Sequence, residues 1–346
     1  MTWFVSAGHG DPEQSVHSSS SVGKMASLSG PIASAIRLHK IDCMGNSMSE
    51  SSSSIPDQAS ADICQRFLFA DADVRGEIVR LTRSYTDAVS NNAYPQAVSS
   101  LLGEFLAAAV LLGSAIKYDG RLVLQVRGDG ELNLIMSECT SEGAVRGIAR
   151  FDKVPESVDF DSLAGEGLLV ITVDSRRSDP YQGIVSLEGG SLAASLQTYF
   201  EQSEQLASWF YFSVDENQAC GFMLQQLPGA ASSDTEAREQ SWQHLLTLAQ
   251  TMTPGEMLAL SNEALLHRLY HQEEVKLFPP RQFHYQCSCS RERTARALIS
   301  IGKEEVDSIV VEQGAVSIAC EFCGTDYRFD ASEVALLFQD RGDLVH

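Results

Sequence analysis

The stretch RLVLQVRGDGELNLIMSE, residues 121–138, predicts two β-strands and the turn that joins them. Apolar and polar residues alternate on both sides of the turn, a pattern typical of strands with one buried face. Glycine and aspartate are favoured in tight turns between antiparallel strands. We therefore expect an antiparallel β-hairpin in which Gly128, Asp129 and Gly130 form the turn and bind no ligand.

Helical and strand-like segments surround this hairpin. A helix is predicted over 98–116, and its apolar run from Phe105 to Ile116 is shorter than the roughly 20 residues that cross a bilayer, so we expect it to be buried. A segment that begins at Ser191 has apolar residues at helical spacing, and four further runs are strand-like. The helical positions are Leu192, Leu196, Tyr199 and Phe200, and the runs are 167–174, 183–189, 209–214 and 221–227.

These segments predict an α+β core domain over residues 62–228, because strands and helices mix without a regular β-α-β order. The stretch GEGLLV, residues 165–170, has its glycines before a strand, whereas a dinucleotide-binding fingerprint has them after one. We therefore expect no nucleotide site there.

Residues 229–286 have a different pattern. A loop-like stretch at 228–241 precedes three short helical segments, at 242–252, 253–260 and 261–272. Thr253, Pro254 and Glu256 form a predicted capping box with a first-turn proline, and Ser261 is a second predicted N-cap. Helices of about 8 to 12 residues are not stable alone in water, so these segments depend on packing against a neighbour. We interpret 229–286 as a metastable helical linker.

Four of the eight cysteines lie within residues 287–346. Cys287-x-Cys289 and Cys320-x-x-Cys323 offer four sulfur ligands, which suit one tetrahedral Zn²⁺ ion, and Gly324 permits a tight turn after the second pair. The alternative is that the thiols merely cluster or pair as structural disulfides. Cys287–Cys289 and Cys320–Cys323 disulfides are sterically reasonable, so the site is also a candidate redox switch.

A metal would dominate the stability of this C-terminal module. A core of this size contributes about 3 to 5 kcal/mol, whereas a structural zinc contributes on the order of 10 to 16 kcal/mol. Metal loss is therefore expected to unfold the module. The fold class expected for the chain is α+β, with a mixed sheet-and-helix core domain, a short-helix linker and a small C-terminal zinc-binding domain.

Other candidate residues favour ordinary structural roles. Cys43, Cys64, Cys139 and Cys220 are interpreted as unpaired thiols, and without a secretory signal the chain is expected in a reducing, cytoplasmic compartment. His267 and His271 stand four apart, but the glutamate of a metalloprotease motif is absent, so they predict a solvated helix face. The Arg-Gly-Asp sequence at 341–343 is interpreted as chance.

The first 60 residues contain 16 serines and no sustained periodicity, so residues 1–61 are predicted to be a disordered extension. Met44 and Met48 are possible alternative starts. An organellar transit peptide is the other interpretation, and the low arginine content of this segment weakens it.

The net charge of −21 argues against binding to nucleic acid or to anionic membranes. Residues 281–346 contain seven Lys and Arg against eleven Asp and Glu, so a zinc ribbon that binds nucleic acid is disfavoured. A thiol oxidoreductase that uses Cys320 and Cys323 would need these cysteines at a helix start in a thioredoxin-like β-α-β unit, which the sequence does not show.

Ten motifs resemble those of the redox-regulated heat-shock holdase chaperones, the bacterial 33 kDa chaperonin family. The resemblance covers roughly residues 62–340. The motifs are VRGE (74–77), YPQAVSSLLGEFLAAAVLL (94–112), GDGELNL (128–134), RGIAR (146–150), YQGIVSLEG (181–189), YFEQSEQL (199–206), LYHQEEV (269–275), CSCSRER (287–293), EEVDSIV (304–310) and CEFCG (320–324).

This resemblance implies an ATP-independent chaperone of the oxidative stress response, not an enzyme, that is inactive while reduced and loaded with one zinc ion. It implies that oxidation forms the disulfides Cys287–Cys289 and Cys320–Cys323, releases zinc and unfolds the linker, and that the active form is a homodimer. The partners expected are unfolded client proteins, with no nucleic acid and no membrane. Apolar linker side chains would then bind clients, and they are Leu245, Leu246, Leu248, Leu258, Leu265, Leu266 and Leu269.

Overall fold

The computed structural model describes residues 62–176, 179–187, 189–228 and 235–339. The expectations for residues 1–61, including Cys43, Met44 and Met48, lie outside the described residues, as does the Arg-Gly-Asp sequence at 341–343. The described chain forms a larger compact unit that ends at Cys287 and a smaller one that begins at Ser288. Both contain helices and strands, which confirms the α+β class.

The first sheet of the larger unit is antiparallel, in the order β10-β1-β2-β9-β8, and β11 also pairs with β1. A side chain at Gly76 would collide with the ring of Phe67 on the neighbouring strand, because a Cβ there would lie 2.0 Å from it. The strands are β1 (Ile63–Phe69), β2 (Val74–Leu81), β8 (Ser208–Val214), β9 (Ala219–Gln226), β10 (Val275–Leu277) and β11 (Arg281–Gln282).

The second sheet contains the predicted hairpin, whose strands pair from Arg121 with Thr140 to Val126 with Ile135. The sheet order is β12-β5-β4-β3-β6-β7, with a parallel pair between β12 and β5. A Cβ at Gly128 would lie 1.8 Å from Ala164 O. Position 128 therefore requires glycine, because the hairpin turn lies against the loop that contains Ala164 and Gly165. The strands are β3 (Gly120–Arg127), β4 (Leu134–Thr140), β5 (Ala144–Arg150), β6 (Leu168–Ser175), β7 (Tyr181–Ser186) and β12 (His284–Tyr285).

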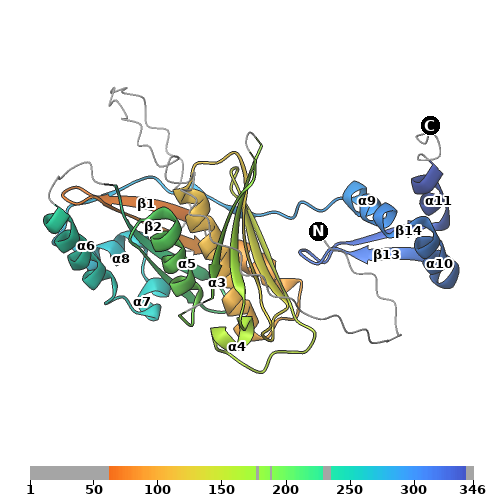
Figure 1. The fold of residues 1–346 in the computed structure, drawn as a ribbon, viewed down its shortest axis with the longest axis horizontal. Coiled ribbons are helices and arrows are strands. Elements are labelled where there is room, and N and C mark those ends of the chain that lie inside the picture. The colour runs from red at the N-terminus through yellow and green to blue at the C-terminus, as the bar shows by residue number, and fades with distance from the viewer. Residues whose placement is uncertain (1–61, 177–178, 188, 229–234, 340–346) are drawn as a thin grey trace, which may run out of the picture. The chain divides into compact units, whose positions relative to one another are not determined.

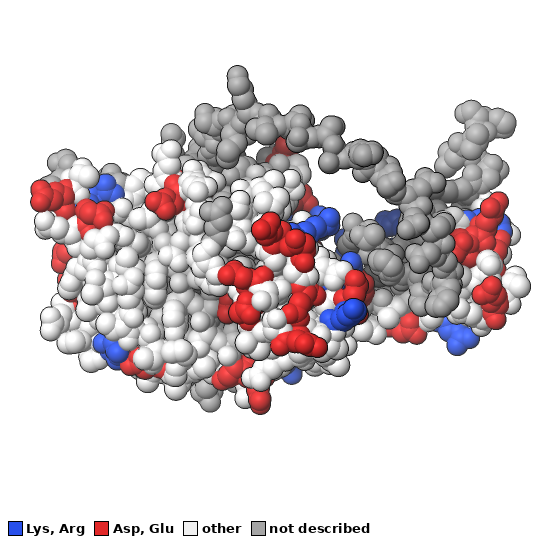
Figure 2. Space-filling view, turned by 60° about the horizontal axis from the view of Figure 1, so that its bottom comes forward, with Lys and Arg blue, Asp and Glu red and all other residues white. Residues whose placement is uncertain are grey.

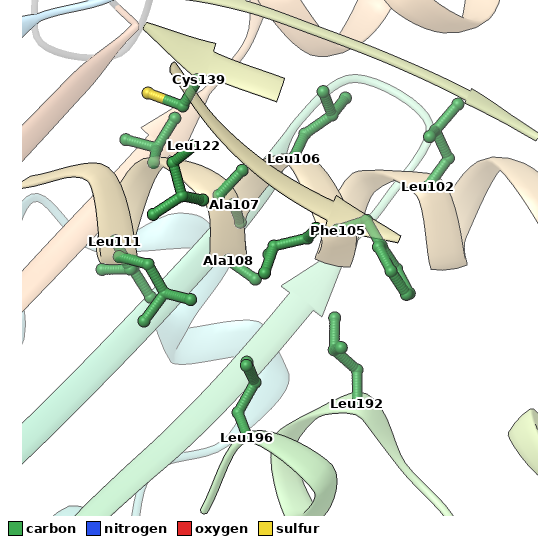
Figure 3. Close-up of a cluster of buried hydrophobic side chains, with 14 of the residues drawn as sticks. Leu102, Phe105, Leu106, Ala107, Ala108, Leu111, Leu122, Cys139, Leu192 and Leu196 are labelled. Atoms are coloured by element: carbon green, nitrogen blue, oxygen red, sulfur yellow. The ribbon is translucent and has the colours of Figure 1, made fainter. Parts of the chain in front are cut away.

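Helix α3 (Gln96–Ala115) forms the centre of the larger unit and packs against strands of both sheets. Figure 3 shows Leu122 and Cys139 approaching α3 from one side and Leu192 and Leu196 from the other. Among the described helices, α3 is long and apolar enough to cross a membrane by length and composition, yet 72% of its apolar window is buried in the protein. The prediction of a buried core helix is confirmed.

Shorter helices complete the core. Helix α5 (Leu192–Tyr199) is capped by Ser191, which accepts a hydrogen bond from Ala194 N, and the apolar positions predicted for this segment are buried. The sequence did not predict the π-helical turn η2 (Phe200–Glu204) that follows. The remaining short helices here are α2 (Arg83–Ser90) and α4 (Phe160–Ala164).

Three helices from the predicted linker pack against the face of the first sheet that points away from α3 (Figure 1). They are α6 (Thr235–Ala249), α7 (Pro254–Ala259) and α8 (Asn262–Tyr270). The capping box at Thr253 and Glu256 and the N-cap at Ser261 are confirmed. The loop prediction for 228–241 was wrong from Thr235 onward, because Trp242, Leu245 and Ala249 bury one side of a 15-residue helix on the sheet.

The smaller unit is built around a two-stranded antiparallel sheet and three helices. Its core consists of six buried side chains, so little apolar area holds it together. The elements are α9 (Arg291–Ile301), α10 (Lys303–Gln313), β13 (Ala315–Ala319), β14 (Asp326–Asp330) and α11 (Ala331–Gln339), and the core side chains are Leu298, Val306, Val316, Ile318, Phe329 and Val334.

The buried carboxyl group of Glu104 on α3 is expected to make the stability of the fold depend on pH. Burial raises the pKa of its carboxyl group to about 7, whereas an unfolded glutamate titrates near 4.3. The folded protein therefore binds more protons between these values, and the stability that Glu104 contributes falls as the pH rises through this window. We expect Glu104→Gln to gain stability relative to the wild type between pH 5 and pH 8, by at most about 3 kcal/mol.

Urea unfolding of both proteins at several pH values, followed by tryptophan fluorescence, measures this difference. All other ionisable groups are the same in the two proteins, so their contributions cancel in the difference between the two unfolding free energies. A difference in unfolding free energy that stays constant from pH 5 to pH 8 would contradict the prediction.

Candidate metal centre

The four C-terminal cysteines lie together. The Sγ atoms of Cys287, Cys289, Cys320 and Cys323 are all within 4.8 Å of one another, and those of Cys289 and Cys323 are 3.4 Å apart. Four sulfurs around one tetrahedral ion, with bonds of about 2.3 Å, would be about 3.8 Å apart. The donor set therefore fits a soft metal ion, and this cluster could hold one.

The C-x-C pair is positioned by the start of α9. Ser290 caps the helix by accepting a hydrogen bond from Arg293 N at 3.3 Å. The Arg293 guanidinium reaches back and donates to Ser288 O at 2.7 Å. Because Ser288 lies between the two cysteines, the helix start restrains the backbone that presents Cys289.

The C-x-x-C pair forms the turn between β13 and β14. Cys320 N donates to Thr325 O at 2.8 Å, and Gly324 N donates to Cys320 O at 2.7 Å. Gly324 has a φ of 68°, in the left-handed region that favours glycine, which confirms the predicted tight turn. Cys320 is buried, whereas the other three cysteines are partly exposed.

Hydroxyl groups contact two of the sulfurs. Tyr327 on β14 donates from its hydroxyl to Cys289 Sγ at 3.1 Å, and this hydrogen bond raises the pKa of Tyr327 to about 12. Cys323 Sγ donates to Thr325 Oγ1 at 3.2 Å. Partners of this kind orient the ligands of a metal and tune their reactivity.

The scattered cysteines have a different environment. Cys64, Cys139 and Cys220 are almost completely buried in the larger unit. Burial raises the pKa of Cys139 and of Cys220 to about 11, and it also raises the pKa of Cys64 well above its usual value. Since the thiolate is the reactive form, these three thiols are protected both sterically and chemically.

Two other features noted in the sequence are the histidine pair at 267 and 271 and the turn of the hairpin. His267 and His271 are both exposed on one side of α8, with ring centroids 6.1 Å apart, which agrees with the predicted solvated face. A cavity of about 710 Å³ beside the hairpin turn is lined by acidic residues, including Asp129 and Glu131. The Asp129 carboxylate accepts a hydrogen bond from Glu166 N, and the Glu131 carboxylate accepts one from Glu156 N. Both side chains therefore stabilise neighbouring loops.

The aromatic face of the first sheet beneath the linker helices was not predicted from the sequence. Tyr270 of α8 packs edge-on against Phe69 with ring centroids 4.8 Å apart, and Phe67 contacts Phe222 at 5.6 Å. Alternate aromatic residues in QRFLF, 65–69, are the pattern that could have revealed this strand. The linker leucines named from the sequence all belong to this buried or partly buried cluster.

Comparisons with known proteins identify relatives along most of the chain. Residues 62–330 match the family model described as Hsp33 protein. The chain is 50% identical over 285 residues to the 33 kDa chaperonin of Pseudomonas paraeruginosa, covering 82% of this chain and 96% of the relative. It is 49% identical over 284 residues to the 33 kDa chaperonin of Azotobacter vinelandii, covering 81% and 96%.

A solved structure shares the fold. The crystal structure of the 33 kDa chaperonin, a heat shock protein 33 homolog, from Thermotoga maritima superimposes with a TM-score of 0.69 at 24% identity. The match covers 80% of this chain and 97% of that one.

The contrast between the two groups of cysteines predicts selective alkylation. With the metal removed at pH 7.5, we expect iodoacetamide to modify Cys287, Cys289 and Cys323 quickly. Cys139 and Cys220 should react at least about 100-fold more slowly than an ordinary exposed thiol, because burial raises their pKa from 9.0 to about 11 and two pKa units lower the thiolate fraction by that factor. Peptide mass spectrometry over a time course measures each rate. Early modification of Cys139 or Cys220 in folded protein would contradict the prediction.

Proposed function

The chain belongs to the Hsp33 protein family, a family of chaperones that bind client proteins, and on that basis we propose that it is a redox-regulated, ATP-independent holdase. The observation that carries this proposal is the cluster of four cysteine sulfurs in a chain of this family. The holdase is inactive when reduced and binds unfolding proteins after oxidation.

In the reduced state Cys287, Cys289, Cys320 and Cys323 hold one Zn²⁺ ion per chain. The ion supplies a crosslink between two segments that are thirty residues apart in sequence. The thiolates are partly exposed at three of the four positions, so an oxidant such as a peroxide reaches them.

Oxidation forms two disulfides, Cys287–Cys289 and Cys320–Cys323. Four thiolates lose four electrons, two peroxide molecules accept them together with four protons, and four water molecules result. A disulfide sulfur is a poor ligand, so the ion leaves. The smaller unit then has only its six-residue apolar core, which is too small to keep it folded.

Loss of the smaller unit's structure releases the metastable linker, residues 229–286, from the first sheet. Each of its helices depends on packing, since none exceeds 15 residues. Release exposes the linker leucines together with the aromatic sheet face, including Phe67, Phe69 and Phe222. Both surfaces bind apolar segments of unfolding clients.

The remaining properties follow from the same proposal. The active form is a homodimer, and the chain works in a reducing, cytoplasmic compartment where oxidation is the exception. Figure 2 shows acidic side chains across the face it draws. The net charge of −21 keeps a complex with exposed apolar surface soluble and disfavours nucleic acid and anionic membranes as partners.

The oxidoreductase alternative loses support from the hairpin position of Cys320 and Cys323. Redox-active C-x-x-C pairs gain a lowered pKa at the N-terminus of a helix. Here the pair lies in the turn between β13 and β14. The nucleic-acid alternative is disfavoured by the acidic smaller unit.

The holdase proposal predicts a peroxide-dependent gain of function. Peroxide with mild heat should release one zinc ion per chain, make residues 235–277 sensitive to protease and suppress aggregation of an unfolding client. A chromogenic chelator, limited proteolysis and light scattering measure the three effects. Cys139→Ser removes a thiol outside the cluster and serves as the matched control, with the same response as the wild type. Equal suppression by reduced and oxidised protein would refute the proposal.

Metal removal without oxidation tests the structural role of the ion. A chelator should unfold residues 288–339 and release the linker helices, while the two sheets and α3 stay folded, because structural zinc contributes on the order of 10 to 16 kcal/mol. Hydrogen exchange resolved by peptide measures both regions in one experiment. Unchanged protection of α9 and β13 after complete metal removal would contradict this role.

A further inference from the structure

A buried polar network joins the first sheet to the linker. Arg80 on β2 donates from Nε to Asn262 Oδ1 at 2.7 Å and from Nη2 to Leu260 O. Asn262 Nδ2 donates to Gln65 Oε1 at 2.9 Å, and Gln65 Nε2 donates to Phe278 O at 2.9 Å. Two strand residues are thus bonded to three points of the linker.

The network lies within an apolar interface. Arg80, Asn262 and Gln65 are 6%, 1% and 4% exposed. Ile78, two residues before Arg80 on the same face of β2, belongs to the apolar cluster beneath the linker. Within the described residues, no carboxylate forms an ion pair with Arg80, so neutral acceptors alone satisfy this buried cation.

The acceptors of Arg80 come mainly from the linker. Asn262 is the first residue of α8, and Leu260 is the C-cap residue of α7. The third acceptor is Cys220 Sγ on the sheet, which lies 3.6 Å from Arg80 Nη1. A buried charge is tolerated only where its hydrogen bonds are complete. The linker can therefore dock in the one register that brings Asn262 and Leu260 O to the guanidinium.

We propose that Arg80, Asn262 and Gln65 form a latch that allows the linker to dock on the sheet only in its inactive position. This inference rests on the proposed function, since it names the contact that selects that position. When the linker leaves, water hydrates Arg80, so the latch costs little to open. When the linker is docked but Asn262 is missing, Arg80 is buried without its acceptor, and the docked state is penalised.

A double-mutant cycle tests the latch in the reduced, zinc-loaded full chain. The variants are Asn262→Leu, Arg80→Met and the two combined, and His244→Ala is the control. His244 pairs with Glu273 within the linker at an exposed position, where such a pair contributes little. Hydrogen exchange of the α8 amides reports linker opening, and light scattering of a client reports holdase activity without oxidant.

We expect Asn262→Leu to increase linker opening by about 10-fold to 100-fold, the factor for leaving a buried charged donor unsatisfied. It should also suppress client aggregation without peroxide. The combined variant should return close to the wild type, because apolar groups replace both partners. His244→Ala should stay within about twofold of the wild type.

Two outcomes would overturn the latch. One is Asn262→Leu with wild-type protection of α8, and the other is a combined variant as open as Asn262→Leu alone, which would indicate lost packing. Failure of the proposed function gives a different result. In that case Asn262→Leu opens the linker, yet neither this variant nor peroxide-treated wild type suppresses aggregation.

Discussion

The first sheet is apolar on both faces, and the two faces are covered in different ways. One face packs against α3, a 20-residue helix buried along most of its length. The other packs against α6, α7 and α8, which are too short to persist without the sheet. Since apolar area in water is unfavourable by about 25 cal/mol per Å², the second face always requires a partner. The helices occupy it in the reduced protein, and we propose that clients occupy it after oxidation.

The three scattered cysteines and the four clustered cysteines lie in different parts of the structure. Burial raises the pKa values of Cys64, Cys139 and Cys220, so these thiols resist oxidants while the larger unit stays folded. Of the four clustered thiols, Cys289, Cys320 and Cys323 lie in the unit with the smaller apolar core, and Cys287 is the last residue of the larger unit. We therefore propose that oxidation acts where a chemical change has the largest effect on folding and leaves the sheet that would bind clients intact.

Local patterns predicted much of the structure. The hairpin at Gly128, the buried helix α3, the capping box at Thr253 and the turn at Gly324 each depend on residues close in sequence. The latch depends on a pair separated by 182 positions, so no local pattern reveals it. The same reason explains why α6 was placed too late, since its first turns form by packing on a distant sheet.

The docked linker combines an apolar contact with a polar network, and the two have different effects. Apolar packing is non-directional, so by itself it would permit sliding and alternative registers. The hydrogen bonds of Arg80 and Asn262 add little net stability, because water replaces them when the linker leaves. They do penalise every docked arrangement that leaves the guanidinium without acceptors. The docked state is thus specific but only moderately stable, and we propose that unfolding of the smaller unit is enough to release the linker.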